Sequence, residues 1–452
     1  MKNLFKYAAV QWKSMLAIIV ILFVQAYCDL SLPAYTSDIV NVGIQQGGIE
    51  DQIPEAISVE EMDRLLLFVP EDDQQTVLDA YDKDDSTYDT EAYVLKSSVS
   101  DNEDEIGELE DFLQGPMMLV SGFESGSDMT KQIESQIKEN LPPQMVSEDM
   151  DIFDIMEMLP QEQRDAMTEK MSEQLKDMPD SILEQAAVSY VRSAYENVGM
   201  DMDRMQTNYL LVTGGKMAAL AFLGMAASVT VGFLASRVGA STGRNLRSRV
   251  FKKVVGFSNN EFDHFSTASL ITRSTNDIQQ IQLLTVMLLR IVLYAPILAI
   301  GGIWQVFQTN VSMSWIIALA VVLIALVILV LFLVAMPKFK ILQTLVDKVN
   351  LVMREILTGL PVIRAFSTEK HEEERFDAAN LDLTKTNLFV NRAMTFMMPV
   401  MMLVMNGVSV LIMWTGAHGI DDGQMQVGDM MAFIQYTMQI IMGFLMLCML
   451  SI

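Results

Sequence analysis

Apolar stretches that are long enough to cross a lipid bilayer alternate with charged segments along most of this sequence. A helix needs about 20 mainly apolar residues to cross the hydrocarbon core, and residues 312–336 contain no charged side chain at all. We therefore predict an all-α membrane protein with six long transmembrane helices. The predicted spans cover residues 14–44, 206–237, 283–307, 312–336 and 392–417, and a sixth begins near residue 427.

The negative charge of the chain is concentrated between its first two spans. The 452 residues have a net charge of −26, and residues 50–203 hold 41 of the 57 acidic side chains. The remainder is apolar and mildly basic. One region thus has the composition of a water-soluble insertion and the other that of a membrane domain.

Basic residues at the end of the second span determine the predicted orientation. The positive-inside rule places such residues in the cytoplasm, so the N-terminus lies inside and residues 49–205 are extracellular, in a multi-pass protein of the plasma membrane. Nucleic-acid binding is the rival explanation for a basic run, and the adjacent span disfavours it. These basic residues are Arg237, Arg244, Arg247, Arg249, Lys252 and Lys253.

The first 13 residues combine lysines with aromatic side chains, which is typical of a helix at the inner membrane surface. A signal peptide ending before Cys28 is the alternative. Tyr27 argues against it, because the residue before a cleavage site must be small. Pro33 is expected to kink the first span.

The insertion is predicted to be mostly helical or α+β. Residues 59–69, 150–159 and 182–191 have amphipathic helical spacing, with Ser147 as an N-cap, whereas the carboxylate-rich residues 82–111 are expected to form a loop or to be weakly ordered. A calcium site is the alternative for these carboxylates. We favour a solvated acidic face, because neither acidic run has the glycine or the final glutamate of an EF-hand loop.

The cysteine and histidine content predicts neither a disulfide framework nor a metal site. Cys28 and Cys448 lie in apolar spans far apart in the sequence. The three histidines His264, His371 and His418 form no cluster with other metal-binding residue types.

Residues 338–380 form a polar segment between two apolar spans. Gly359 and Pro361 are expected to interrupt its helix, because glycine is permissive and proline disfavours helical backbone at the residue before it. Residues 360–366 should then form a short transverse element. We expect a long helix on either side, each extending from the membrane into the cytoplasm.

Three strings in this sequence resemble those of one family. ExLxGxPVIRAFxxExxxxxRF, which begins at Glu355, is similar to the second intracellular loop of ABC exporters with six helices in each half. EFDHFSTASLITRSTNDIQQIQ, which begins at Glu261, resembles their first intracellular loop. GQMQVGDMMAFIQY, which begins at Gly423, resembles their connection between the fifth and sixth helices. The resemblance covers residues 1–48 and 206–452 and leaves the insertion unmatched.

The resemblance implies two coupling helices that dock on ATP-binding domains. Four polar residues also match motif positions, namely Arg273, Asp277, Glu355 and Glu369, for which solvated helix faces are the alternative. The coupling residues implied are Phe262, Asp263, Phe265, Leu360, Pro361, Val362, Ile363, Arg364, Ala365 and Phe366.

The resemblance further implies that ATP and Mg²⁺ bind a domain missing from this chain, which we expect to end within its sixth span. No GxxxxGK[ST] loop occurs in these 452 residues, since the partial likeness at Gly214, Gly215 and Lys216 lies in a predicted membrane helix. The chain therefore offers no catalytic motif. The implied partners are a second half-transporter, identical or different, and the ATP-binding domains.

A methionine stripe in the fifth span is the candidate for substrate contact. Flexible thioethers suit varied apolar shapes, so a cavity for amphiphilic drugs, lipids or peptides is one interpretation and packing between helices is the other. Asp29 is also a candidate, since a carboxylate in a span needs a partner or water; an ordinary structural pairing is its alternative. The candidate cavity residues are Asp29, Met394, Met398, Met401, Met405 and Gln435.

Two other classes of protein are weighed against the exporter. A polytopic receptor or sensor would bind a ligand in its acidic ectodomain, but it has no need for two cytoplasmic loops on extended helices. A secondary transporter typically has broken helices and acidic pairs at the midplane. Neither trait is seen in this sequence.

Overall fold

Five helical segments in the computed structural model are long and apolar enough to cross a membrane. The structure describes residues 11–84, 88, 90–100, 102–126, 131, 152–160, 164, 168, 179–258, 261, 265–309 and 313–451. Within these residues the five segments are Trp12–Gln45, Met202–Val255, Thr267–Gln308, Ser314–Ala365 and Glu369–Asp421. They confirm an all-α membrane protein.

The sixth predicted span corresponds to α18, Val427–Ser451, which is not among these five segments. It is a single helix of 25 residues, so a helix is present where the sixth span was predicted.

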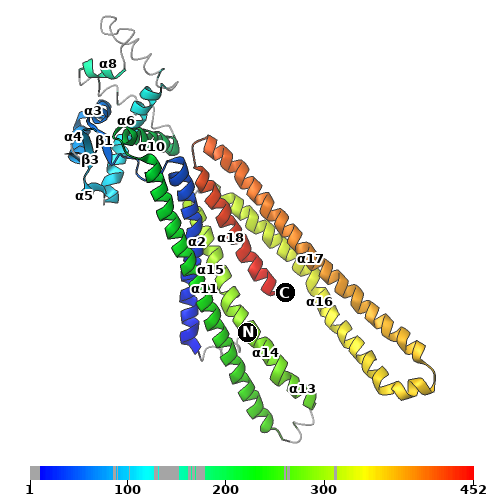
Figure 1. The fold of residues 1–452 in the computed structure, drawn as a ribbon. Helices are drawn as coiled ribbons and strands as arrows, with labels where there is room; N and C mark the ends of the chain where they lie inside the picture. The colour runs from blue at the N-terminus through cyan, green and yellow to red at the C-terminus, as the bar shows by residue number, and fades with distance from the viewer. Residues whose placement is uncertain are drawn as a thin grey trace. The chain divides into compact units, whose positions relative to one another are not determined.

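The other long segments are built from α-helices with short π-helical turns (Figure 1). They comprise α2 Trp12–Asp38 with η2 Ile39–Gln45, α11 Met202–Val255, α13 Thr267–Thr272, η3 Arg273–Asp277, α14 Ile278–Met287, η4 Leu288–Val292, α15 Tyr294–Thr309, α16 Ser314–Ala365 and α17 Glu369–Asp421.

The prediction that Gly359 and Pro361 interrupt the helix is wrong. Helix α16 includes both residues and ends at Ala365. Pro361 removes one N–H from the ladder, but the neighbouring hydrogen bonds keep the segment helical. Figure 1 shows the last turns of α16 bending away from the axis of its preceding part. Pro33 likewise lies inside α2, which continues to Asp38.

The chain divides into two compact units. The first comprises residues 1–30, 224–415 and 433–452 and contains most of the apolar helical length. In one of its cores, Ile18 and Leu22 of α2 pack against Val231 and Val238 of α11. In another, α16, α17 and α18 meet around Ile324, Met397, Met401, Ile441 and Leu445.

The second unit comprises residues 31–223 and 416–432 and includes the insertion. Its core is formed by side chains such as Phe68, Leu113, Met117 and Tyr190, all with less than 2% exposure. The elements of the insertion are β1 Ala56–Ser58, α3 Val59–Leu66, α4 Glu71–Asp79, β2 Tyr81–Asp84, β3 Ala92–Leu95, α5 Ser97–Ser100, α6 Glu103–Ser125, α8 Ile152–Met158 and α10 Asp180–Asn197.

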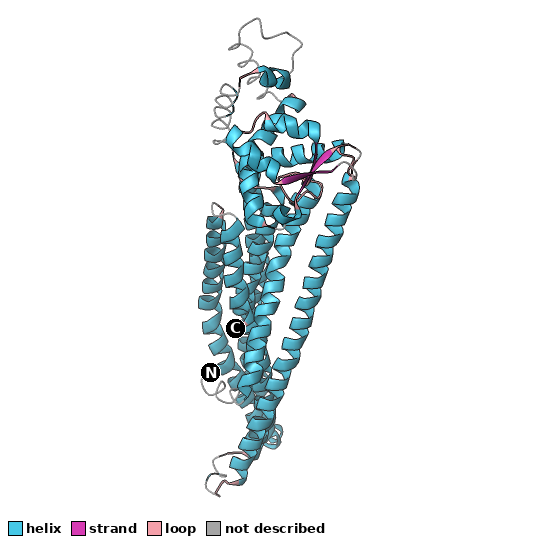
Figure 2. Cartoon of the chain, turned by 90° about the vertical axis from the view of Figure 1, so that its left-hand side faces the viewer, coloured by secondary structure: helices cyan, strands magenta, loops and turns pink. Residues whose placement is uncertain are grey.

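The expectation that residues 82–111 form a loop is also wrong for the described part of that range. Strand β3 pairs antiparallel with both β1 and β2, so that Ile57 lies opposite Tyr93 and Tyr81 opposite Leu95 (Figure 2). Ala92, Leu95 and Leu109 are buried and supply apolar contacts. The prediction weighed the many carboxylates of this range and overlooked these apolar residues. Helices α3, α8 and α10 lie where helical spacing predicts them, whereas Ser147 lies outside the described residues.

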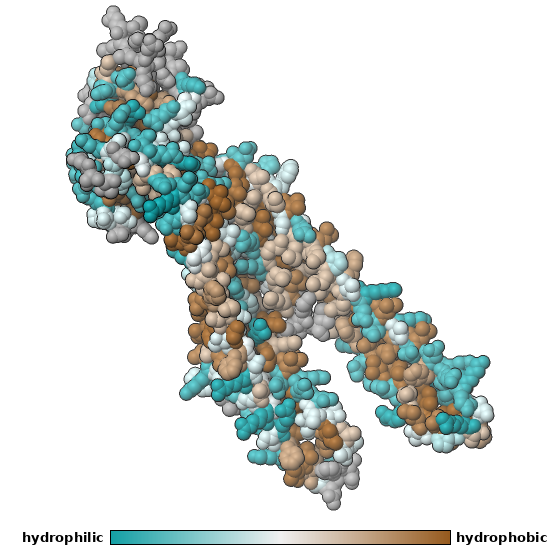
Figure 3. All heavy atoms as spheres, in the orientation of Figure 1, coloured by the Kyte–Doolittle hydropathy of each residue, from teal (hydrophilic) through white to brown (hydrophobic). Residues whose placement is uncertain are grey.

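Hydrophobic side chains gather on the surface of the long helices (Figure 3). Leu211, Phe222 and Phe233 are each at least 65% exposed. A surface of this kind is stable against lipid tails and unfavourable in water. Toward the end where α16 meets α17, hydrophilic and hydrophobic residues are mixed on the surface (Figure 3).

Candidate functional site

The turn between α16 and α17 presents an apolar end outside the packed cores. Phe366 is 76% exposed and Val362 is 61% exposed. Leu360 and Ile363 are partly buried, whereas Pro361, Arg364 and Ala365 are exposed. The predicted coupling residues of this loop therefore lie together at the tip of a helical hairpin.

Backbone geometry makes this turn very short. Thr368 N–H donates to Ile363 O at 3.1 Å and Ser367 N–H donates to Arg364 O at 3.4 Å. This is a Schellman motif, which reverses the chain directly after a helix. It requires left-handed backbone, and Ser367 has φ 54°. No glycine marks the turn, so sequence reasoning could not place it.

Three side-chain contacts hold α16 and α17 together as an antiparallel pair. Lys338 Nζ lies 5.5 Å from the Phe389 ring, Lys348 Nζ lies 3.7 Å from Asp382 Oδ2, and Arg375 pairs with Glu355. As the residue number rises on α16, it falls on α17. The motif residue Glu355 therefore has its partner in the same motif, whereas Glu369 is exposed.

The first loop is organised by stacked side chains near its ends. The rings of Phe257 and Phe265 stack at 5.8 Å, and the Arg273 guanidinium lies 5.4 Å from the Phe265 ring. Hydrogen bonds from the backbone N–H and hydroxyl of Ser258 lower the pKa of Glu261. Phe262 and Asp263 lie outside the described residues.

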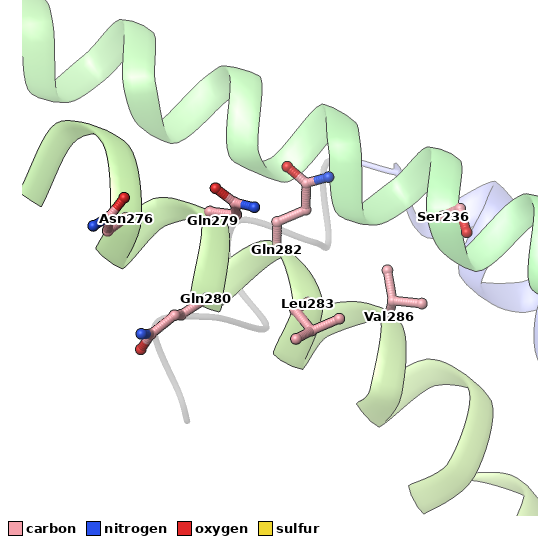
Figure 4. A pocket seen from close by; sticks show the side chains of 7 residues that line it. All are labelled: Ser236, Asn276, Gln279, Gln280, Gln282, Leu283 and Val286. Carbon is pink, nitrogen blue, oxygen red and sulfur yellow. The ribbon is translucent and has the colours of Figure 1, made fainter.

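A polar cavity of about 550 Å³ lies beside η3 and α14. Figure 4 shows Gln279 and Gln282 projecting toward α11, whereas Gln280 projects the other way. Gln282 lies against Gly239 and Gly243 of α11, where an added Cβ would meet its atoms at 3.1 and 2.8 Å. Asp277, at the end of η3, is exposed. The lining residues are Ser236, Asn276, Gln279, Gln280, Gln282, Leu283 and Val286.

A buried polar cluster joins the end of α2 and η2 to the start of α18. Asp429 Oδ1 accepts from Ser37 Oγ at 2.8 Å and from Asn41 Nδ2 at 3.1 Å. Gly428 N–H donates to Asn41 Oδ1 at 2.7 Å. Asp429 Oδ2 also accepts from Gln426 N–H at 3.2 Å, which caps α18. The cluster explains the Gly-Asp pair of the third motif.

Helix α10 of the insertion contacts the connection between α17 and α18. Ser181 Oγ donates to Gly423 O, and Gln426 Nε2 donates to Glu184 Oε2 at 3.0 Å. Gly423 has φ +68°, and a Cβ there would lie 2.7 Å from Ile182. The insertion therefore binds the same short connection that begins α18.

Asp29 lies in α2 with polar partners from two other helices. Tyr294 OH of α15 donates to Asp29 Oδ2, and Gln439 Nε2 of α18 donates to the backbone oxygen of Asp29 at 2.9 Å. The structure thus brings Asp29 close to two polar residues that the sequence did not connect with it.

Helix packing buries some of the methionines in the stripe on α17 and leaves others exposed. Met401 is buried at 1% exposure and packs against α16 and α18, and Met405 packs partly buried beside it. Met398 is 49% exposed. Met394 and Gln435 are partly buried. Packing therefore accounts for Met401, and Met398 retains an open surface.

The described residues contain no group of three His, Cys, Asp or Glu side chains that could hold a metal ion. Gly214, Gly215 and Lys216 lie within α11. Their backbone is helical, and a helix interior cannot wrap its N–H groups around a phosphate.

Comparison with known proteins decides the family. The family model for the ABC transporter transmembrane region matches residues 181–444. The chain belongs to this family. Membership in the ABC transporter family favours transport over the receptor and secondary-transporter alternatives, and it confirms the resemblance of the three motifs at the level of ABC transporters.

Several relatives of this ABC transporter chain are curated. An uncharacterized ABC transporter ATP-binding protein of Mycobacterium bovis is 36% identical over 233 residues, covering 52% of this chain and 40% of that protein. YfiB of Bacillus subtilis, an uncharacterized ABC transporter ATP-binding protein, is 34% identical over 242 residues. The match covers 52% of this chain and 41% of YfiB. The mitochondrial iron-sulfur clusters transporter atm1 of Neurospora crassa is 24% identical over 272 residues. The match covers 56% of this chain and 36% of that protein. The chain spans about two fifths of the length of such relatives.

Sequence reasoning missed Arg375, Ser37, Asn41 and Tyr294. Arg375 belongs to the quoted motif string, so a search for opposite charges within that string could have found its pair. Ser37 and Asn41 are one helical turn apart on the first span, which was an available signal. Nothing in the sequence connected Tyr294 with Asp29.

Proposed function

We propose that this ABC transporter chain is the membrane-spanning part of an exporter driven by ATP hydrolysis. A cavity between the helices would open alternately to the inside and the outside as rigid groups of helices move. The expected substrates are amphiphilic drugs, lipids or peptides. The plasma membrane is the proposed location, with the N-terminus inside and residues 49–205 outside.

The observation that carries the proposal is the tip formed by Val362 and Phe366. Exposing a large apolar side chain to water is unfavourable, and burying it against a partner protein is favourable. The Schellman turn and the Glu355–Arg375 pair hold this tip at the end of two long helices. Such a rigid lever suits the transfer of movement from an ATP-binding domain.

The proposed partners are a second half-transporter and two ATP-binding domains. ATP and Mg²⁺ would act in those domains, where ATP hydrolysis supplies the energy for the change of state. The names of the relatives support this assignment, because those from Mycobacterium bovis and Bacillus subtilis are described as ATP-binding proteins. The stacked residues Phe257 and Phe265 of the first loop would contribute the second docking point.

We further propose that the insertion acts on the outer opening of the transporter. Helix α10 binds the connection between α17 and α18 through Ser181 and Glu184. The adjoining Asp429 cluster links that connection to α2. Any outward movement of α18 relative to α2 must break these hydrogen bonds, so the insertion would favour the closed outer end.

The test of coupling uses the full-length protein, reconstituted in liposomes with its partner half if it has one. ATP hydrolysis and uptake of a fluorescent amphiphile would be measured together. We expect the double variant Val362→Ala, Phe366→Ala to lower coupled transport about tenfold, since loss of buried apolar contacts costs about 1–3 kcal/mol. Leu351→Ala is the matched control, because Leu351 is 50% exposed on the same helix but away from the tip.

Equal loss in both variants would point to general destabilisation of α16 rather than to docking. Unchanged transport in the tip variant would contradict the coupling role. Absence of ATP-dependent transport in the wild-type protein, across cationic, neutral and anionic amphiphiles, would contradict export itself.

A further inference from the structure

Asp29 is a carboxylate within a membrane-spanning helix and has no cationic partner among the described residues. It lies in the segment Trp12–Gln45, and none of the ion pairs of the described chain includes it. A charge in a span is costly, and such residues usually mark a pathway or binding site. Asp29 therefore needs an explanation.

The protein satisfies only part of this carboxylate. Oδ2 accepts from the Tyr294 hydroxyl, whereas no described residue donates a hydrogen bond to Oδ1. Gly224 of α11 lies beside Oδ1 without a side chain, and a Cβ added there would be 3.7 Å from Oδ1. A phenol donor brings no positive charge to the carboxyl group.

A second acceptor of the same cluster also lacks a partner. Gln439 donates through Nε2 to the backbone oxygen of Asp29 at 2.9 Å, and its Oε1 is buried without a hydrogen bond from any described residue. A buried acceptor without a donor is costly. Asp29 and Gln439, which this hydrogen bond joins, therefore each carry a side-chain acceptor that no described donor satisfies.

Close packing of three helices keeps this cluster in place. Gly301 and Gly302 of α15 allow Leu30 and Ile440 to approach, because an added Cβ would lie 2.4 and 2.7 Å from them. Gly443 of α18 lies in the same way against the Ala295 backbone oxygen. Asp29, Tyr294 and Gln439 are nevertheless each only partly buried as whole residues.

We propose that Asp29, Tyr294 and Gln439 bind the positively charged group of an amphiphilic organic cation. The inference rests on the proposed export function and names the charge class of its substrate. An organic cation suits the site better than an inorganic one, because hard metal cations require about six oxygen ligands. The Tyr294 ring offers a further cation–π contact, and the surrounding apolar helices accept hydrophobic arms.

The test compares two ions of the same shape and opposite charge. The purified full-length protein in lipid nanodiscs would be titrated with radiolabelled tetraphenylphosphonium and tetraphenylborate, with empty nanodiscs to subtract partition into lipid. We expect the wild type to bind the phosphonium cation more tightly. Asp29→Asn should raise its Kd about tenfold or more, as expected for loss of a charged partner.

Asp38→Asn is the matched control, because it makes the same charge change on the same helix, and its Kd should stay within about twofold of the wild type. Equal binding of the two ions by the wild type would overturn the site even if the Asp29 variant fails to fold. A folded Asp29→Asn protein with an unchanged Kd would overturn it too.

Transport in liposomes separates this inference from the proposed function. Binding that depends on Asp29, without ATP-dependent movement of the cation or of neutral and anionic amphiphiles, would support the site and contradict export. ATP-dependent transport of tetraphenylphosphonium that is equal in the wild type and Asp29→Asn would contradict the site and leave export standing.

Discussion

Glu355 of α16 and Arg375 of α17, which lie 20 residues apart in the chain, form an ion pair across the helical hairpin. Arg375 also contacts Glu372, one turn away on its own helix, at 3.4 Å. The two residues come from opposite ends of one motif. Their pairing indicates that the motif preserves the geometry of a turn as well as a docking sequence.

Removal of the ion pair should have a small effect on stability. Both side chains are more than 40% exposed, and exposed pairs contribute about 0.2–1 kcal/mol because water and salt screen them. A double-mutant cycle with Glu355→Gln and Arg375→Gln, read by chemical unfolding, should give a coupling energy in this range that falls at high salt. A coupling energy well above 2 kcal/mol would show that the pair is more shielded than its exposure indicates.

Ser367→Gly should stabilise the turn by about 0.5 kcal/mol, because glycine adopts left-handed backbone without the cost borne by serine. Thermal unfolding of the purified protein would measure the change. Thr358→Gly is the control, since Thr358 is exposed inside α16, where glycine should destabilise by about 0.5–1 kcal/mol. The same sign of change for both variants would rule out our account of the turn.

Gly428→Ala should destabilise the start of α18. An added Cβ would lie 2.5 Å from both Asn41 Oδ1 and the backbone oxygen of Ser37, and overpacking of this kind costs about 1–3 kcal/mol. Gly407→Ala is the matched control, because a Cβ there meets nothing within 4 Å and alanine favours a helix. The unfolding temperature should fall for the first variant and stay equal or rise for the second.

The insertion should lose stability as the pH rises from acid to neutral. Burial raises the pKa of Glu55, and Asp51 and Glu50 raise it further; burial also raises the pKa of Asp51. The folded state therefore holds more protons than the unfolded state between the ordinary pKa of these carboxyls and the raised one. The stability that Glu55 and Asp51 contribute is fully present below their ordinary pKa. It is lost as the pH rises through their raised pKa in the folded protein.

Hydrogen exchange of β1 and β3 at several pH values would measure this dependence. Glu55→Gln should flatten the profile, because glutamine does not titrate. A profile with the opposite slope in the wild type, or an unchanged slope in the variant, would contradict the prediction.

Loss of the contact between α10 and the connection to α18 should favour outward opening. Glu184→Ala removes the acceptor of Gln426, and labels on α2 and α18 would report the distance between their outer ends by spin–spin measurement. We expect a larger population of the longer distance. Glu196→Ala provides the control. Among the described residues Glu196 pairs with Arg192 on its own helix at 3.1 Å, so the variant should leave the distances unchanged.

Length and apolar content were sufficient to predict the long helices, because hydrogen bonds along each helix are local and a span is defined by its own residues. Two local rules failed. Gly359 and Pro361 remain within α16 because surrounding helical hydrogen bonds outweigh the local preference of these residues, and residues 81–84 and 92–95 form strands because β3 has partners on both sides.

The sequence by itself determined the membrane class, the acidic insertion and the family of this protein, since these depend on composition and on short strings of neighbouring residues. Only the tertiary structure decided the partners of Asp29, the Asp429 cluster and the contact of α10 with the connection to α18. Each of these joins residues that are more than 200 positions apart. Their meeting depends on how helices pack, and packing is a property of the whole set of side chains at an interface rather than of any one segment.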